Sequence, residues 1–145
     1  MASSYGTDAD KSSLRSNYLT ARRRIDPATK AALDARIRGR LEGFEIYVGA
    51  ELVLAYVSYG NEVDTRFVIE SALASGKRVA VPRVSPHKHK MDFFEISGMG
   101  DLAEGFKGIL EPKRGLSSPL GTEDLLGSVC LVPGLVFDSA GHRIG

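Results

Sequence analysis

Two basic side chains near the N-terminus have the spacing to hold a phosphate group. Lys11 and Arg15 lie four residues apart, so on a helix they share one face. A guanidinium binds phosphate oxygens as a fork, and an ammonium adds a point charge. The alternative is a solvated basic face, which the same pattern also describes. Spacing alone leaves both interpretations open.

A carboxylate between an expected strand and an expected helix is the second candidate. Glu62 follows a buried apolar run, where it can accept hydrogen bonds from the N–H groups of a heterocycle. The alternative is that Glu62 and Asp64 favour the helix dipole and that Asp64 or Thr65 caps the helix. From the residues alone, the capping interpretation is favoured.

The segment from Pro133 to Gly145 passes from a strand into glycine turns that include Arg143. This pattern resembles a phosphate-binding loop, whose backbone must approach oxygen atoms closely. It is neither the Walker A pattern nor the Rossmann glycine fingerprint.

Two other features give weaker signals. His87 and His89 lack the cysteine or acidic companions of a zinc site, so a polar loop is the preferred interpretation and no metal site is assigned. Cys130 lies within an apolar run, where a small buried hydrophobic residue is expected and a nucleophile is not.

Two basic helices are expected to open the chain. Residues 11–41 contain nine basic and two acidic side chains, and apolar residues recur there at helical spacing. Asp26 suits an N-cap and Pro27 the first position of the second helix, which we expect to end near Gly43 and to turn its apolar positions inward. Those positions are Leu33, Ile37 and Leu41.

The middle of the chain predicts a strand–helix–strand unit with a parallel sheet. The apolar run 52–57 reads as a strand covered on both faces, and a helix over 65–75 ends at Gly76. Further strands are expected at 78–81, closed by Pro82, at 91–96 on an edge, and at 129–132. Residues 97–127 read mostly as loop, with a helical turn at 122–126. Ligands of such sheets gather beyond the carboxyl ends of the strands, here 58–65, 82–91 and 133–145.

Composition narrows the function classes. The chain has 145 residues and a net charge of +1, which predicts one domain and argues against a general nucleic-acid or membrane-surface binder. No apolar stretch approaches the length of a membrane span, and the first residues lack the apolar core of a secretion signal. A single cysteine fits the reducing cytoplasm.

Several motifs, in order along nearly the whole chain, resemble the 5-formyltetrahydrofolate cyclo-ligase family, also called methenyltetrahydrofolate synthetase. They are Lys11-x-x-Leu14-Arg15, Asn61-Glu-Val-Asp-Thr65, Gly76-Lys-Arg-Val-Ala-Val-Pro-Arg83, Met91-Asp-Phe93, Gly108-Ile-Leu-Glu-Pro112 and Pro133-Gly-Leu-x-Phe-Asp-x-x-Gly-x-Arg-x-Gly145.

This resemblance implies a three-layer α/β/α sandwich with a mostly parallel sheet. It also implies an ATP- and Mg²⁺-dependent ring closure of 5-formyltetrahydrofolate to 5,10-methenyltetrahydrofolate, releasing ADP and phosphate. By the resemblance, Lys11 and Arg15 belong to the ATP phosphate site, and Arg143 and Gly145 begin a glycine-rich nucleotide loop. Glu62 would hold the folate, with Val57 and Met91 as apolar walls near the pterin.

The family pattern continues past Arg-x-Gly into further glycines, a Tyr-Tyr pair and an aspartate that binds Mg²⁺, whereas this chain stops at Gly145. We therefore expect a C-terminally truncated, monomeric cyclo-ligase domain that lacks the closing strands and is weak or inactive. The alternatives are a nucleotide- or folate-binding remnant without turnover and an enzyme similar to phosphosugar isomerases.

Overall fold

The computed structural model describes residues 8–85 and 90–145, which form two compact units. One unit combines the chain up to Ala32 with Pro133–Gly145, and the other is Leu33–Val132. A single domain for the whole chain stays a prediction. His87 and His89 lie outside the described residues.

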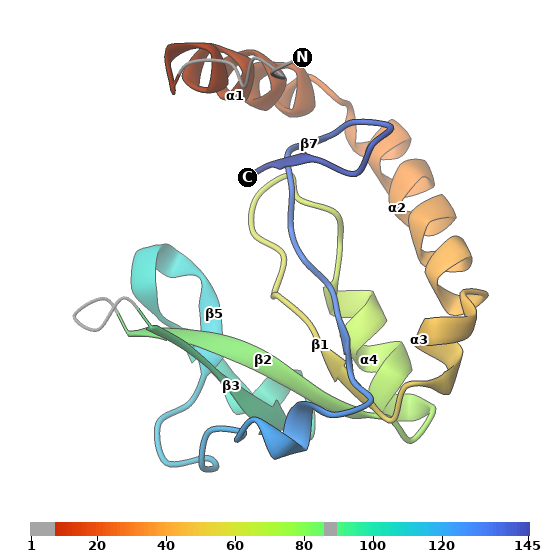
Figure 1. The fold of residues 1–145 in the computed structure, drawn as a ribbon, viewed down its shortest axis with the longest axis vertical. Coiled ribbons are helices and arrows are strands. Elements are labelled where there is room, and N and C mark those ends of the chain that lie inside the picture. The colour runs from red at the N-terminus through yellow and green to blue at the C-terminus, as the bar shows by residue number, and fades with distance from the viewer. Residues whose placement is uncertain (1–7, 86–89) are drawn as a thin grey trace, which may run out of the picture. The chain divides into compact units, whose positions relative to one another are not determined.

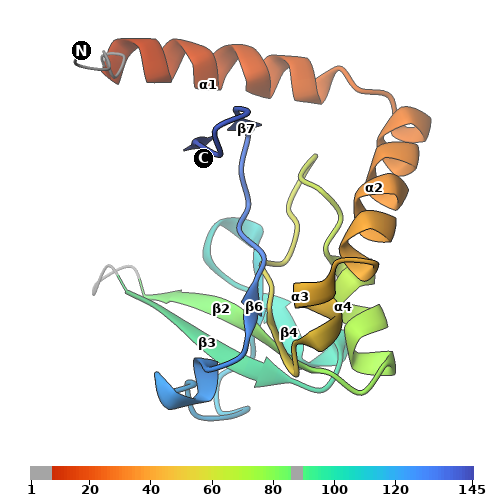
Figure 2. The ribbon, with the colours of Figure 1, turned by 45° about the vertical axis from the view of Figure 1, so that its right-hand side comes forward.

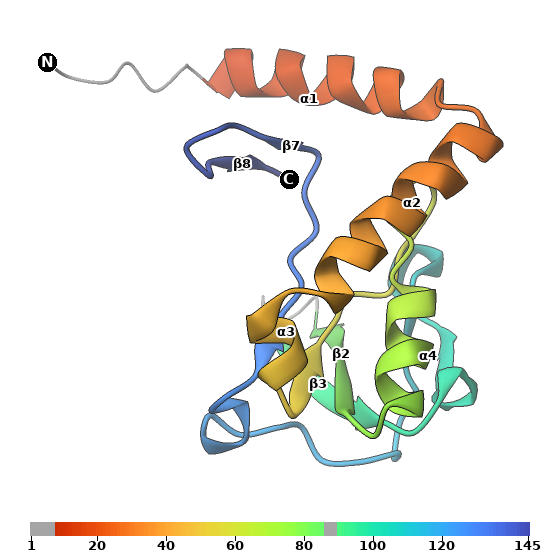
Figure 3. The same cartoon turned by 90° about the vertical axis from the view of Figure 1, so that its right-hand side faces the viewer.

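The first unit contains the expected basic helix and a small hairpin. Helix α1 covers Asp8–Arg23, and α2, Pro27–Glu42, begins in this unit and ends in the second. The Asp26 carboxylate accepts the Thr29 N–H at 2.9 Å, so the predicted N-cap is confirmed. Strands β7 (Val136–Phe137) and β8 (Arg143–Ile144) pair in antiparallel fashion, as Figure 3 shows.

The second unit is built on a four-stranded sheet in the order β3-β2-β1-β6. Its strands are β1 (Leu52–Leu54), β2 (Arg78–Ser85), β3 (Lys90–Ile96) and β6 (Val129–Cys130). β1 is parallel to both β2 and β6, and β2 is antiparallel to β3. Helix α4 (Arg66–Ala74) connects β1 to β2 (Figure 1), so the predicted strand–helix–strand unit and a mixed α/β fold with a mostly parallel sheet are confirmed.

The two faces of this sheet are covered differently. On one face, Val53, Val79 and Val81 are fully buried with Ile69 of α4, and Tyr47 of α3 (Glu45–Gly49) joins them. On the other face, the small cluster of Leu52, Leu54 and Ala80 is covered by Phe93 and by Leu120 and Leu125, which follow β5 in the chain. There the described residues supply loop and a 3-10 turn, η3 (Glu123–Leu125), which matches the expected turn.

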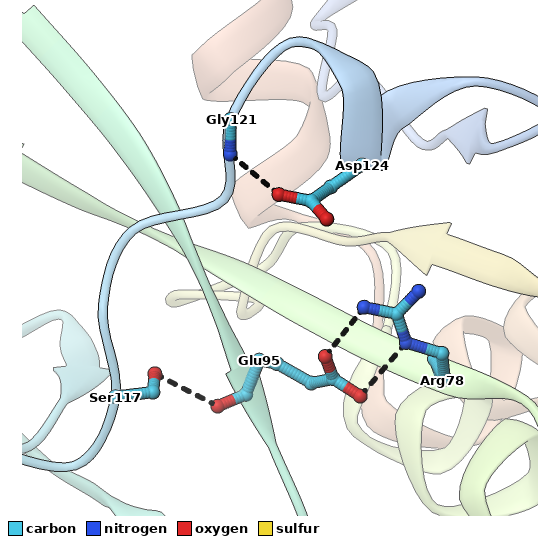
Figure 4. A network of polar contacts seen from close by, with 5 residues as sticks. All are labelled: Arg78, Glu95, Ser117, Gly121 and Asp124. Atoms are coloured by element: carbon cyan, nitrogen blue, oxygen red, sulfur yellow. Dashed lines mark hydrogen bonds and ion pairs between the residues drawn. The ribbon is translucent and has the colours of Figure 1, made fainter.

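A polar network holds the segment that covers this second face (Figure 4). Arg78 donates from Nε and Nη2 to the Glu95 carboxylate at 3.0 and 2.8 Å. Ser117 donates to the backbone oxygen of Glu95 at 3.5 Å, and Asp124 accepts the Gly121 N–H at 2.8 Å. The Arg78–Glu95 pair joins β2 to β3, the Ser117 contact joins the segment after β5 to β3, and the Asp124 contact lies within that segment.

The expectation that Pro82 ends the second strand is wrong, because β2 continues through it to Ser85. Pro82 lies opposite Phe93, whose carbonyl accepts from Leu120 and therefore points away from β2. The proline nitrogen also points outward, on the side where β1 pairs with β2 only as far as Ala80. No ladder hydrogen bond is lost, so the proline is tolerated.

Several short elements were missed in the sequence. The expected loop 97–127 contains an antiparallel hairpin of β4 (Leu102–Glu104) and β5 (Leu110–Pro112), together with the 3-10 turns η1 (Met99–Asp101) and η2 (Phe106–Gly108). Helix α3 was also not predicted. All of these elements are too short to show a periodic pattern.

The apolar positions of α2 also differ from expectation. Leu33 and Ile37 are exposed, and only Leu41 packs against the core, because only the last turn of the helix reaches it. None of the helices in residues 8–85 and 90–145 has the length and apolar character that a membrane span requires.

Candidate functional site

Three of the four predicted nucleotide residues come together in the first unit. Arg15, on α1, donates from Nε to the backbone oxygen of Gly145 at 2.6 Å. A Cβ placed on Gly145 would lie 3.8 Å from Nη1 of Arg143, so the two arginines approach the same glycine. Lys11 is an exposed residue of α1, four positions before Arg15. Two guanidinium groups beside one backbone segment give this part of the unit a positive charge.

The hairpin that presents Arg143 is closed by one carboxylate. Asp138 accepts the backbone N–H groups of Ala140 and His142 at 2.9 and 2.8 Å, and its other oxygen pairs with Nδ1 of His142 at 2.8 Å. The hydrogen bonds from His142, helped by that from Ala140, lower the pKa of Asp138 from its ordinary 3.8. The turn is therefore held by an ionised carboxylate.

A close approach also fixes the start of this hairpin. A Cβ on Gly134 would lie 2.3 Å from Cζ of Phe137 and 3.1 Å from Cγ of Arg143. A side chain at this position would displace both neighbours. The Arg143 guanidinium in turn donates from Nη1 to the backbone oxygen of Pro133. Glycine at 134 is thus what lets Arg143 fold back along the hairpin.

In the second unit, Glu62 lies in the turn that follows β1. Its Oε2 accepts the Tyr59 N–H at 2.9 Å, and its own N–H donates to the Tyr59 carbonyl at 3.2 Å. The side chain is half-buried. The carboxylate is therefore held by the backbone of its own turn, in the segment between β1 and α4.

The acidic side chain that contacts the start of α4 is that of Asp64, two residues after Glu62. Asp64 accepts the Arg66 N–H at 3.0 Å. Thr65 instead uses its buried hydroxyl to accept from Ser58 N–H at 2.9 Å and to donate to the Tyr56 carbonyl at 2.6 Å. Of the two acids that could serve the helix start, the one that contacts it is Asp64.

The two apolar residues predicted near the pterin differ in exposure. Val57 is 5% exposed and belongs to the core cluster. Met91 is 55% exposed and pairs across β2–β3 with Val84. Met91 is therefore an exposed apolar side chain, whereas Val57 is packed in the core.

A cleft of about 420 Å³ lies between β2 and the β4–β5 hairpin. We call it the β2–β5 cleft; its lining residues are Arg83, Val84, Ala103, Glu104, Gly105, Phe106, Glu111, Pro112, Lys113 and Arg114. It was missed because most of these residues fall in the segment read as loop. The adjacent cations Lys113 and Arg114, directly after a motif proline, were the available signal.

The expectation of a buried Cys130 is wrong. β6 lies at the edge of the sheet (Figure 2), and Cys130 is exposed. Partial burial nevertheless raises the pKa of its thiol, which disfavours the thiolate at neutral pH. Within the described ranges, no three His, Cys, Asp or Glu side chains gather as a metal-binding group.

Comparison with known proteins assigns the family. The model of the 5-formyltetrahydrofolate cyclo-ligase family matches residues 7–145. The chain belongs to this family.

Relatives and solved structures agree with this assignment. The chain is 28% identical over 144 residues to a mitochondrial 5-formyltetrahydrofolate cyclo-ligase of Arabidopsis thaliana, covering 91% of this chain and 52% of the relative. It is 27% identical over 125 residues to the Escherichia coli K12 cyclo-ligase, covering 86% and 68%. The chain thus spans about half to two thirds of the length of these relatives.

A similar fold is found in the 5,10-methenyltetrahydrofolate synthetase of Aquifex aeolicus. The TM-score is 0.80 at 25% identity, over 93% of this chain and 66% of that one. A synthetase from Mycoplasma pneumoniae, at 18% identity and a TM-score of 0.67 over 94% of this chain and 71% of that one, shares the fold.

Proposed function

We propose that this protein takes part in the ATP-dependent cyclisation of 5-formyltetrahydrofolate to 5,10-methenyltetrahydrofolate, with release of ADP and phosphate. The observation that carries the proposal is the meeting of Arg15, Arg143 and Gly145 in a member of the cyclo-ligase family. Relatives bearing that name perform a ring closure in which such cations have a clear use.

The residues of the first unit fit a nucleotide's phosphate groups. Arg15 and Arg143 supply guanidinium groups near the same glycine, Gly145, and Lys11 adds an ammonium from the same helix as Arg15. Cations placed in this way bind phosphate oxygens and offset the negative charge that grows during phosphoryl transfer. ATP would supply the phosphoryl group that makes the formyl oxygen a leaving group.

Within the described residues, Mg²⁺ would be held mainly by the phosphate groups of the bound nucleotide. No group of three acidic, histidine or cysteine side chains gathers within residues 8–85 and 90–145. Mg²⁺ is commonly held by one or two carboxylates together with substrate phosphates and water. We therefore assign none of the described residues as its ligand.

Glu62 is the proposed anchor of the folate ring. Its carboxylate is already oriented by the Tyr59 N–H, and Asp64 carries the helix cap. A fixed carboxylate beside a strand end accepts hydrogen bonds from the N–H groups of a pterin. Val57 would support this wall from the core, and Met91 would contact the ring from β3.

The chemistry needs no covalent nucleophile from the protein. A formamide is a poor electrophile, and phosphorylation of its oxygen allows the N10 amine to attack the carbon and close the ring, with phosphate leaving. The contribution of the side chains is then positioning and charge stabilisation. Cys130, with its raised thiol pKa, has no part in this scheme.

Binding and turnover test the proposal separately. Isothermal titration of the 145-residue chain with ATP and with 5-formyltetrahydrofolate should show saturable binding of both. Turnover is measured as an ATP-dependent rise in methenyl-folate absorbance together with ADP release. If neither ATP nor 5-formyltetrahydrofolate binds, the proposal is contradicted.

A second candidate is a protein that binds the nucleotide or the folate without turnover. It predicts binding of ATP or folate with no ADP released. Restoring the relatives' remaining sequence would then restore turnover. A sugar-phosphate isomerase activity would instead proceed without ATP.

We further propose that the protein acts as a monomer in the cytoplasm. The support is its single cysteine and its balanced charge. Size-exclusion chromatography with light scattering tests the oligomeric state, and fractionation of the source cells tests the compartment.

A further inference from the structure

His142 is a titratable residue of the β7–β8 hairpin that the proposed chemistry does not use. It lies in the turn of the hairpin, directly before Arg143, and its side chain is 70% exposed. Histidine is the side chain whose charge ordinarily changes between pH 5 and pH 8. The charge of this turn can therefore vary over the range in which most enzymes work.

The contact with Asp138 fixes which ring nitrogen carries the proton. Nδ1 of His142 lies 2.8 Å from Oδ2 of Asp138. Hydrogen bonds from His142 and Ala140 lower the pKa of this carboxyl, so at neutral pH it is ionised and can only accept. Nδ1 is therefore the donor, and Nε2 of the neutral ring has the free electron pair. A second proton can add at Nε2 while the contact with Asp138 is kept.

The backbone of the turn is held independently of that second proton. The His142 N–H donates to Oδ1 of Asp138 at 2.8 Å, and the His142 carbonyl accepts the Asp138 N–H at 3.1 Å. Asp138 also accepts the Ala140 N–H at 2.9 Å. None of these contacts involves Nε2. Protonation at this atom therefore changes the charge of the turn and keeps its hydrogen bonds.

Cations outnumber acids on the two elements that meet here. The hairpin itself carries Asp138 and Arg143, and α1 contacts the hairpin through the hydrogen bond from Arg15 to Gly145. The charged side chains that the structure describes on α1 are Asp10, Lys11, Arg15, Arg22 and Arg23. A bound anion would therefore meet a positive field on this unit, to which a protonated ring adds.

Phosphate groups at the proposed nucleotide site would change the charge around the ring. Arginine side chains oppose a further positive charge nearby, whereas phosphate groups favour one. The Cα atoms of His142 and Arg143 are about 3.8 Å apart, as in any adjacent pair. This spacing is well within the screening length of about 8 Å at physiological salt. The charge of the ring and that of a phosphate held by Arg143 therefore interact without direct contact.

We propose that His142 takes up a proton at Nε2 when ATP binds and thereby acts as an additional cation of the nucleotide site. This inference rests on the proposed function, because it describes the charge of the same site. The two equilibria are linked, so a protonated ring strengthens ATP binding as much as ATP favours protonation. A site that binds ATP together with a proton loses affinity as the pH rises. Nucleotide binding is thus sensitive to pH in the range where histidine titrates.

Isothermal titration of the 145-residue chain with ATP tests the proposal. Titrations in buffers of different ionisation enthalpy give the number of protons taken up per ATP. Phosphate groups of ATP also titrate near neutral pH, so the decisive quantity is the difference between the wild type and His142→Gln. Glutamine keeps an N–H donor for Asp138 and does not ionise. We expect the wild type to take up more protons per ATP than this variant.

The pH dependence of affinity gives a second measurement. Between pH 6 and pH 8, the ATP affinity of the wild type should fall about threefold more than that of His142→Gln, the size expected for an exposed charge interaction. His142→Lys keeps a donor for Asp138 and remains charged over this range. It should bind ATP more tightly than His142→Gln at pH 8 and should show no extra proton uptake.

A matched control removes the other imidazoles of the chain. The double variant His87→Gln, His89→Gln lacks the two other histidines of the sequence and should retain the proton uptake of the wild type. Circular dichroism reports that each variant is folded. Loss of the extra proton uptake in this control would assign it to those histidines and would contradict the role of His142.

Equal proton uptake by the wild type and His142→Gln overturns the inference, as does equal ATP affinity of His142→Lys and His142→Gln at pH 8. Either result leaves the proposed nucleotide site intact, because ATP still binds. Failure of ATP to bind the wild type at both pH 6 and pH 8 instead overturns the nucleotide site and this inference with it.

Discussion

Arg15 and Gly145 are 130 positions apart in the chain, yet the arginine Nε lies 2.6 Å from the glycine's backbone oxygen. This contact joins the basic face of α1 to the end of the β7–β8 hairpin. Arg15 therefore has a hydrogen-bond partner outside its own helix, unlike a side chain that is surrounded only by solvent. In the proposed function, the remaining donors of this guanidinium would bind a phosphate group of the nucleotide.

Replacement of Arg15 should weaken nucleotide binding more than it weakens the fold. We expect Arg15→Gln to lower ATP affinity about tenfold, because a hydrogen bond to a charged group contributes roughly 1.5–3 kcal/mol. Arg15→Lys should recover only part of this loss, since the fork is absent. Titration with ATP measures both. The exposed Arg36 on α2 provides the control, and equal losses in Arg15→Gln and Arg36→Gln would remove the proposed role of Arg15.

Glu62 and Asp64 give a matched pair for the folate site. Glu62→Gln retains an oxygen for the Tyr59 N–H but removes the charge, and we expect folate affinity to fall about tenfold with thermal stability unchanged. Asp64→Asn keeps an acceptor for Arg66 N–H, because Asn caps helices as well as Asp, and should leave folate affinity unchanged. If the two variants bind folate alike, Glu62 has a structural role only.

Long periodic segments were the predictable part of this fold. The N-cap at Asp26, the helix that ends before Gly76 and the parallel arrangement of β1 and β2 all follow from local patterns. Gly76 has a φ of +83°, a conformation that glycine adopts without steric cost. In these places one residue type fits the backbone far better than the others.

What the sequence did not predict depends on partners far along the chain. Pro82 lies within a strand because β1 ends before it, and Cys130 is exposed because β6 is an edge strand. The residues adjacent to Pro82 and Cys130 in the sequence do not predict either outcome. The cleft was missed for the same reason, since Arg83 meets the carbonyl of Pro112 only once the β4–β5 hairpin has formed.

The turn that presents Arg143 should open in acid. Hydrogen bonds from His142 and Ala140 lower the pKa of Asp138 below its ordinary 3.8. A carboxyl group whose pKa is lower in the folded chain than in the unfolded chain stabilises the fold at pH values above its pKa in the unfolded chain. This stabilisation is lost as the pH falls through the pKa of the group in the folded chain. The side-chain carboxyl carbon resonance of Asp138 should therefore show its transition with a midpoint below 3.8.

Asp138→Asn provides the control for this titration, because the amide keeps an acceptor oxygen and does not ionise in this range. The carboxyl transition should then be absent, because no carboxyl remains at position 138. A midpoint above 3.8 in the wild-type protein would contradict the assigned direction of the shift.

The buried hydroxyl of Thr65 should set the stability of the Glu62 turn. It accepts from Ser58 N–H and donates to the Tyr56 carbonyl, while its side chain is almost fully enclosed. Thr65→Val keeps the shape but leaves both backbone groups unpaired, and we expect it to lower the free energy of unfolding by about 1–3 kcal/mol. Thr65→Ser keeps both bonds and loses one methyl group, at about 1 kcal/mol. Urea unfolding followed by circular dichroism separates the two, and a Val variant as stable as the Ser variant would show that packing, not hydrogen bonding, is what Thr65 contributes.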